Sequence, residues 1–165
     1  MSTIFALLSI LFLLQLPSEP RCKVNIIGDS QVGNIISYAR SDSKKNDWQL
    51  SSSWVSGVSI RYWIPKYKKI GADVTIVMLG SNDVDGKPTA EKLASQIEGQ
   101  CIWVGPTNVY GRGNRVNQLI KNSVSDRCIW LDSQDIPLTD KIHPTIKGRE
   151  IWWGRISALI SKKCS

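Results

Sequence analysis

Residues 24–40 read VNIIGDSQVGNIISYAR and join a short apolar run to a helix-like stretch. The run at 24–27 is nearly all apolar, as is typical of a strand buried on both faces of a parallel sheet. The tripeptide GDS at 28–30 forms the turn, and the helix-like stretch at 32–40 follows at once. This segment predicts a β-strand that runs directly into an α-helix.

The same alternation continues along the chain. Further apolar runs predict strands at 48–55, 74–79, 102–104 and 129–131, and further helix-like stretches predict helices at 60–70, 88–98, 114–123 and 144–162. Pro88 and Pro144 begin two of these stretches, where the first turn of a helix tolerates proline. Five successive β-α units predict an α/β fold: a three-layer α/β/α sandwich around a five-stranded parallel sheet with right-handed crossovers.

Length and composition limit the alternatives. The chain has 165 residues, enough for one domain with a core, and its 42% hydrophobic and 21% charged residues exclude a disordered, collagen-like or coiled-coil protein. Its formal net charge is +7. That charge suits work near anionic polymers or membrane surfaces, although a solvated basic face is the simpler interpretation. No nucleic-acid-binding motif is present, so we expect no nucleic-acid partner.

The N-terminal segment predicts export. Residues 4–16 read IFALLSILFLLQL, an uncharged run of 13, whereas a membrane-spanning helix needs ~20 apolar residues, so no stable span is expected. We expect a signal peptide over residues 1–21, a single domain over residues 22–165, and a secreted or periplasmic protein. The alternative is an uncleaved N-terminal anchor, because the segment has no early Lys or Arg and no clean small-x-small cleavage site.

Four cysteines lie after that segment: Cys22, Cys101, Cys128 and Cys164. An even number in an exported chain predicts two disulfides, with three possible connectivities. Cys101 and Cys128 each open a strand-like run, and parallel neighbours in matched register bring their Cα atoms within bonding range. Cys22 and Cys164 then tie the two ends of the domain together. Free buried thiols remain the alternative, and no C-x-x-C pair argues for metal or redox chemistry.

In such a sheet, ligands bind beyond the carboxyl ends of the strands, and three polar loops follow predicted strands there. They contain Gly-Asp-Ser at 28–30, Gly-Ser-Asn-Asp at 80–83 and Asp-Lys-Ile-His at 140–143. Ser30 opens a helix, so its hydroxyl and N–H face the crevice and the helix dipole favours developing negative charge. The common alternative for such a residue is an ordinary N-cap serine.

Four other residues carry candidate chemistry. His143 is the only histidine, and the carboxylate of Asp140 can reach its Nδ1–H and stabilise an imidazolium. Asn82 can donate its side-chain amide to an oxyanion, as Gly57 can its backbone N–H. Three of them have a simpler interpretation: a solvent-facing histidine, a turn asparagine that bonds its own backbone, and a turn glycine.

The order of these motifs is more specific than any one of them. GDS, then a loop glycine, then G-S-N-D, then D-x-x-H-P-T before the last helix resembles the SGNH (GDSL) hydrolase family over nearly all of residues 23–160. The resemblance implies the SGNH hydrolase fold, with a flavodoxin-like strand order. The block 31–34 reads QVGN and departs from the commoner leucine-containing version, which leaves the subfamily open.

The resemblance also implies roles for the candidate residues. Ser30 would be the nucleophile, His143 the general base and Asp140 the acid that orients it. The N–H groups of Ser30 and Gly57 and the Nδ2 of Asn82 would form the oxyanion hole. The implied activity is hydrolysis of carboxylic esters through an acyl-enzyme, with no cofactor and no metal site.

The chain length and the aromatic content indicate a class of substrate. The chain has seven tryptophans. We expect four of them in the core, at Trp103, Trp130, Trp152 and Trp153. The other three flank the loop at Gly57 and are candidates for a platform under a sugar or acyl chain: Trp48, Trp54 and Trp63.

A short chain has little room for lids, so we expect a shallow site, a monomer, and short-chain acetyl esters on a carbohydrate or cell-wall polymer as substrate. The alternatives are a lipase or thioesterase, an acyltransferase, and a non-catalytic carbohydrate-binding protein on the same scaffold.

Overall fold

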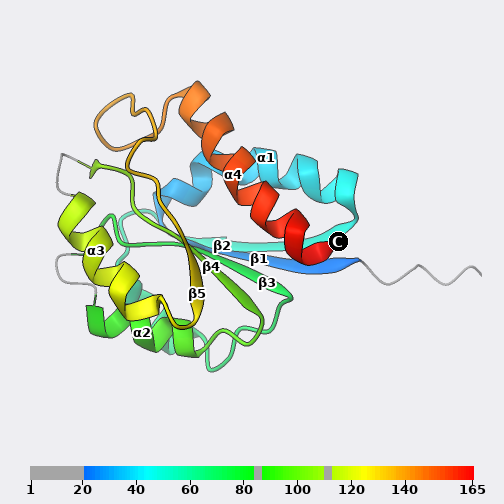
Figure 1. The fold of residues 1–165 in the computed structure, drawn as a ribbon, viewed down its shortest axis with the longest axis horizontal. Helices are drawn as coiled ribbons and strands as arrows, with labels where there is room; N and C mark the ends of the chain where they lie inside the picture. Colours follow the sequence, from blue (N-terminus) through cyan, green and yellow to red (C-terminus); the bar gives the residue numbers. More distant parts are fainter. Residues whose placement is uncertain (1–20, 84–86, 110–112) are drawn as a thin grey trace, which may run out of the picture.

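The structure, a computed structural model, describes residues 21–83, 87–109 and 113–165. A five-stranded parallel sheet crosses the centre of the molecule (Figure 1). Its strands are β1 (Cys22–Gly28), β2 (Trp48–Trp54), β3 (Val74–Met78), β4 (Gln100–Val104) and β5 (Cys128–Leu131). They lie in the order β2-β1-β3-β4-β5, which is the expected flavodoxin-like order.

Helices cover both faces of the sheet (Figure 1). On one face lie α1 (Ser30–Asn46) and α4 (Ile146–Cys164), and on the other α2 (Lys87–Ser95) and α3 (Gly113–Val124). Each face has its own cluster of buried apolar side chains. The three-layer α/β/α sandwich predicted from the alternating pattern is therefore confirmed.

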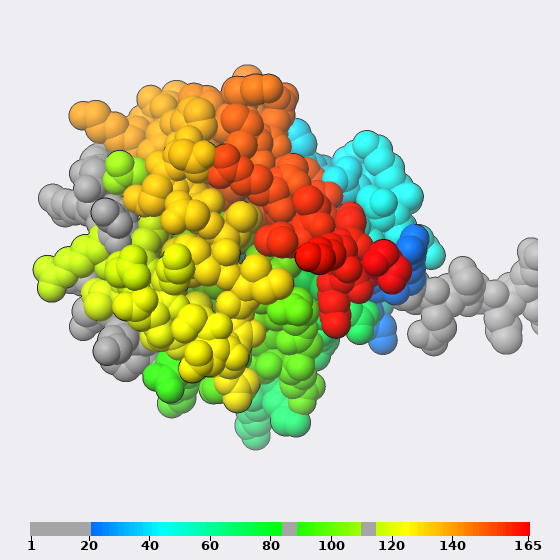
Figure 2. All heavy atoms as spheres, viewed as in Figure 1, coloured from blue at the N-terminus to red at the C-terminus, as the bar shows by residue number. Residues whose placement is uncertain are grey.

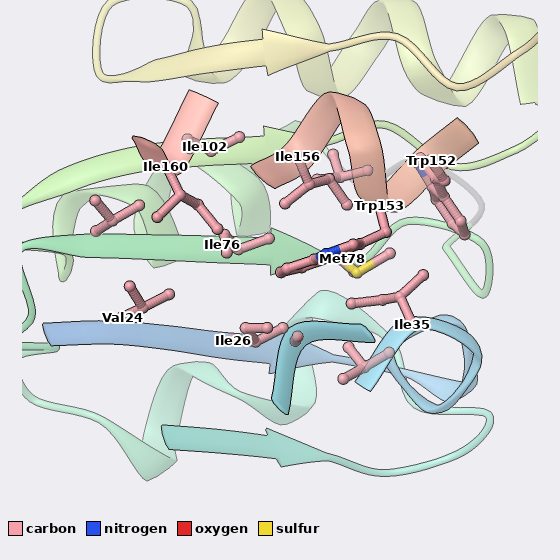
Figure 3. Packing of buried hydrophobic residues seen from close by; sticks show 14 of the residues in the cluster. Val24, Ile26, Ile35, Ile76, Met78, Ile102, Trp152, Trp153, Ile156 and Ile160 are labelled. Atoms are coloured by element: carbon pink, nitrogen blue, oxygen red, sulfur yellow. The ribbon is translucent and has the colours of Figure 1, made fainter. Parts of the chain in front are cut away.

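The α1/α4 face shows how the sheet is packed. Ile156 and Ile160 of α4 lie over Ile76 and Ile102, at the centre of the sheet (Figure 3). The strands β3 and β4 are buried on both faces, because alternate side chains of each strand belong to the α1/α4 cluster and to the α2/α3 cluster. The middle of the sheet therefore has no solvated face.

Two predictions about helices are wrong. Residues 60–70 form two 3₁₀ turns, η1 (Ile60–Tyr62) and η2 (Ile64–Lys66), in place of an α-helix. Pro65 lies in the middle of this stretch and lacks the N–H that a continuing α-helix needs. The last helix was expected to begin at Pro144, but α4 begins at Ile146. Thr145 is the N-cap of α4 and accepts a hydrogen bond from Gly148 N at 2.9 Å, so Pro144 lies before the helix.

The structure contains both expected disulfides. Cys101 and Cys128 are register partners on β4 and β5, with their Cα atoms 4.5 Å apart. Cys22 begins β1 and Cys164 ends α4, and their Cα atoms are 5.6 Å apart. These bonds fasten the last strand to the sheet and the last helix to the first strand.

The expected targeting segment at residues 1–20 lies outside the described residues. Within the ranges that the structure describes, no helix combines the length and apolar character needed to cross a membrane.

Candidate active site

The helix α1 begins directly at the candidate nucleophile. Asp29 is the N-cap, and its Oδ1 accepts a hydrogen bond from Gln31 N at 2.9 Å. Ser30 is therefore the first helical residue and not the cap, so its hydroxyl has no capping role. Gly28 lets α1 approach closely, since a Cβ there would lie 2.5 Å from Met78 O and from a methyl group of Val32.

Asn82 lies between the two other segments expected at the oxyanion hole. Its Nδ2 donates to Asp29 Oδ2 at 3.0 Å and to Val58 O at 3.1 Å. Asp29 directly precedes Ser30, and Val58 directly follows Gly57. The structure thus brings Ser30, Gly57 and Asn82 to one end of the sheet through the two hydrogen bonds of a single amide.

Two glycines near this end have positive φ angles. Gly57 has φ +74°, and a Cβ there would touch nothing within 4 Å, so the backbone conformation alone favours glycine. Gly80 has φ +123°, and its Cβ would lie 2.6 Å from side-chain carbons of Pro106 and Ile120. The turn that carries Asn82 therefore depends on glycine for both conformation and space.

Asp140 and His143 form a hydrogen-bonded pair. Asp140 Oδ2 lies 2.8 Å from His143 Nδ1, and Oδ1 accepts from the backbone N of Ile142 at 3.0 Å and of His143 at 2.7 Å. These bonds, first that of the imidazole and then those of the backbone, hold the pKa of Asp140 well below its usual range. When Nδ1 carries the proton, Nε2 of a neutral ring is free to accept one.

The loop that carries this pair is joined to α1 by Gln31. The Gln31 side chain is buried, and its Nε2 donates to Ile142 O at 3.0 Å. The segment 132–145 lies at the surface beside α4 (Figure 2). Gln31 was not among the residues predicted for the site. The departure of the block 31–34 from the leucine-containing pattern marks Gln31 as unusual, but it does not predict the contact with Ile142.

Asp29 is the buried ionisable group of the site. Its side chain is inaccessible to solvent, and burial raises its pKa to about 6, with a further upward contribution from the nearby carboxylate of Asp83. The hydrogen bonds from Gln31 N and Asn82 Nδ2 oppose that shift. At neutral pH this carboxylate is mostly ionised and accepts from both groups.

Only one of the three tryptophans expected to form a platform is exposed. Trp48 and Trp63 are buried, with 7% and 3% of their surface exposed, so neither can serve as a platform. Trp54, at the end of β2, is 41% exposed. Its indole lies against Gly33 in the first turns of α1, where a Cβ would lie 3.2 Å from a ring carbon. One candidate platform therefore remains, beside the helix that Ser30 begins.

The four tryptophans expected in the core lie there to different degrees. Trp103, Trp152 and Trp153 are buried, and Trp130 is half-buried.

Among the residues described, no cluster of three or more His, Cys, Asp or Glu side chains is arranged to hold a metal ion.

Several solved structures have the same fold as this chain. An acetylxylan esterase from Geobacillus stearothermophilus superposes with a TM-score of 0.65 and 12% identity, over 85% of this chain and 94% of that one. A protein from Parabacteroides merdae classed as a GDSL-like lipase gives 0.64 and 12%, over 82% and 94%. An alpha/beta hydrolase from the metagenome of Lake Arreo, Spain, gives 0.61 and 16%, over 79% and 90%.

These likenesses show that the chain shares its α/β fold with solved hydrolases. More specifically, it is the SGNH (GDSL) hydrolase fold, which the order of the sequence motifs predicted. Neither a protein-family model nor a curated protein sequence matches the chain.

The raised pKa of Asp29 predicts a pH-dependent contribution to stability. The folded state holds the Asp29 proton up to about pH 6, whereas the unfolded chain releases it near 3.8. Raising the pH through this window therefore lowers the free energy of unfolding through this group. Asp29→Asn lacks that titration. The stability of the wild type relative to the variant should fall by about 2 kcal/mol between pH 4 and pH 7, at roughly 1.4 kcal/mol per pKa unit.

The measurement is urea unfolding of both proteins at pH 4, 5, 6 and 7. Asp126→Asn, at an exposed turn, is the control for the general effect of replacing one aspartate by asparagine. A difference between wild type and Asp29→Asn that stays constant over this range would contradict the prediction.

Proposed function

We propose that this chain is a serine esterase that hydrolyses carboxylic esters. Ser30 is the nucleophile, His143 the general base and Asp140 its orienting acid. One observation carries the proposal: the only histidine is hydrogen-bonded to a carboxylate, in a loop tied to the first turn of the helix that Ser30 begins. The sharing of the fold with esterases supports it.

The reaction proceeds in two halves. Ser30 Oγ attacks the ester carbonyl carbon while His143 Nε2 takes its proton, and the tetrahedral intermediate then collapses as the alcohol leaves with that proton. Water, activated by the same imidazole, releases the acid from the acyl-enzyme. Asp140 stays ionised throughout and stabilises the imidazolium, which agrees with the low pKa of its carboxyl.

The oxyanion is held by the N–H groups of Ser30 and Gly57 and by the amide of Asn82. Both Asn82 hydrogens are engaged in the structure, one by Asp29 Oδ2 and one by Val58 O. The bond to the buried carboxylate fixes the side chain. We infer that the oxyanion, when it forms, competes with Val58 O for the second hydrogen of this fixed amide, because a charged acceptor is the stronger one.

The substrate that we propose is a short-chain, acetyl ester on a carbohydrate or cell-wall polymer. Trp54 offers an exposed indole beside α1, and an acetylxylan esterase shares the fold. The basic net charge suits an anionic polymer. We propose that residues 1–21 direct export, in keeping with the two disulfides, and that the domain 22–165 acts as a monomer without nucleic acid.

The test of the proposed function is hydrolysis of p-nitrophenyl esters from acetyl to palmitoyl by the oxidised domain, beside Ser30→Ala. We expect turnover that is highest for acetyl and that is lost in Ser30→Ala, because the acyl-enzyme cannot form. A preference for long chains would indicate a lipase or thioesterase. Faster transfer to sugar hydroxyls than to water would indicate an acyltransferase. Equal rates for wild type and Ser30→Ala would reject the esterase and leave the binding protein.

Asn82→Ala should lower kcat a hundredfold or more. Loss of one oxyanion donor typically costs about 2.7 to 4 kcal/mol of transition-state stabilisation. Steady-state kinetics on p-nitrophenyl acetate measure the loss, and Ser81→Ala in the same turn is the control. If Asn82→Ala retained wild-type kcat, Asn82 would have no place in the mechanism.

Trp54→Ala should distinguish a sugar platform from a structural indole. We expect kcat/KM for an acetylated xylo-oligosaccharide to fall about tenfold, a loss of about 1.4 kcal/mol, because the sugar ring can no longer pack against the indole. For ethyl acetate, which has no ring to stack, the value should change less than twofold. Trp54→Phe keeps an aromatic face and should recover most of the loss. Equal losses on both esters would refute the platform.

A further inference from the structure

Gln31 links the helix that begins at Ser30 to the loop that carries His143. It follows Ser30 in α1, and its side chain is 2% exposed. Its Nε2 donates to Ile142 O at 3.0 Å, and Ile142 precedes His143. The two linked residues are 111 positions apart in the chain. One hydrogen bond thus joins the residue after the nucleophile to the residue before the base.

The Gln31 side chain is held in one orientation. Asn34 Nδ2 donates to Gln31 Oε1 at 3.4 Å and to Ser30 O at 3.3 Å. The backbone N of Gln31 donates to Asp29 Oδ1 at 2.9 Å. With a donor facing the amide oxygen, the amide nitrogen is left facing Ile142 O. The link is therefore fixed at its α1 end by both backbone and side-chain contacts.

The loop at the other end is shaped mainly by bonds within itself. Asp140 bonds to the backbone N of Ile142 and to that of His143, and Thr139 N donates to His143 O at 2.8 Å. These bonds keep the Asp140–His143 pair together, but they do not place it relative to Ser30. The described hydrogen bonds that reach Ile142 O from other segments come from Gln31 and, at 3.5 Å, from Thr107 Oγ1.

We propose that Gln31 is a positioning residue that sets the place of His143 relative to Ser30. This inference rests on the proposed esterase function. Proton transfer between a serine and an imidazole needs hydrogen-bond distance, and a misplacement of about 1 Å can cost a hundredfold in rate. Without the Gln31 link, the Asp140–His143 pair stays intact, but among the described residues only Thr107, at 3.5 Å, still donates to Ile142 O from another segment, so the pair is held less closely to the nucleophile.

The test compares Gln31→Leu with Gln96→Leu. Leucine is similar in size but cannot donate a hydrogen bond. Gln96 is a matched control, because it is a half-buried glutamine whose Nε2 also donates to backbone carbonyls, those of Ile64 at 3.0 Å and Tyr67 at 2.7 Å. These partners lie in the segment that follows β2, and none of them belongs to the proposed triad.

We expect Gln31→Leu to lower kcat on p-nitrophenyl acetate about tenfold to a hundredfold, with KM changed less than threefold. Gln96→Leu should keep wild-type kcat even if its melting temperature falls as far. Gln31→Glu keeps the size of the side chain and the oxygen that faces Asn34, but when ionised it lacks the donor to Ile142. It should show the same loss of kcat and provides a second variant if Gln31→Leu does not fold.

Three results would overturn the inference. Wild-type kcat in a folded Gln31 variant would remove Gln31 from the positioning of His143 and leave the proposed function intact. Equal losses of kcat in Gln31→Leu and Gln96→Leu would assign the effect to general destabilisation. Absence of Ser30-dependent turnover in the wild type would reject the proposed function, and this inference with it.

Discussion

The buried carboxylate of Asp29 holds together the segments on which the site depends. One oxygen caps α1 through Gln31 N, and the other accepts from Asn82 on the loop that follows β3. An ionisable group without solvent contact is costly unless its oxygens are satisfied, so both partners are required by the energetics of burial. The orientation of the first helix and that of the Asn82 amide are consequently fixed by the same acid.

Hydrogen bonds of two side-chain amides then extend this arrangement to the remaining loops. Asn82 reaches the residue after Gly57, and Gln31 reaches the residue before His143. Each amide contacts a neighbour of a candidate catalytic group and not the group itself. The loops are thereby placed through backbone carbonyls, which leaves the hydroxyl of Ser30 and the Nε2 of His143 available for chemistry.

The strands and most helices were predictable because their signals are local. Continuous apolar runs mark the inner strands, which are buried on both faces. Every predicted strand, including the more polar edge strand β2, is present within a few residues of its expected bounds. The exception at 60–70 shows the limit of such reasoning. An apolar pattern is present there, but Pro65 interrupts the hydrogen bonding, and the segment satisfies its backbone in short 3₁₀ turns. Trp54 is exposed whereas Trp48 and Trp63 are buried, and this difference depends on contacts between segments. The hydrogen bond from Gln31 to Ile142 O also joins distant segments. No local pattern in the sequence predicts either feature.

The Cys22–Cys164 bond bears on how the molecule can be tethered. It lies at the start of β1 and the end of α4, whereas the candidate site lies beyond the opposite, carboxyl ends of the strands. In Figure 1 the marked C-terminus and the segment 132–145 are at opposite sides of the molecule. A surface, scaffold or fusion partner joined directly at Arg21 or at Ser165 would therefore meet the covalently clamped end of the sheet. The rim that carries Ser30 and Trp54 would face away from that attachment.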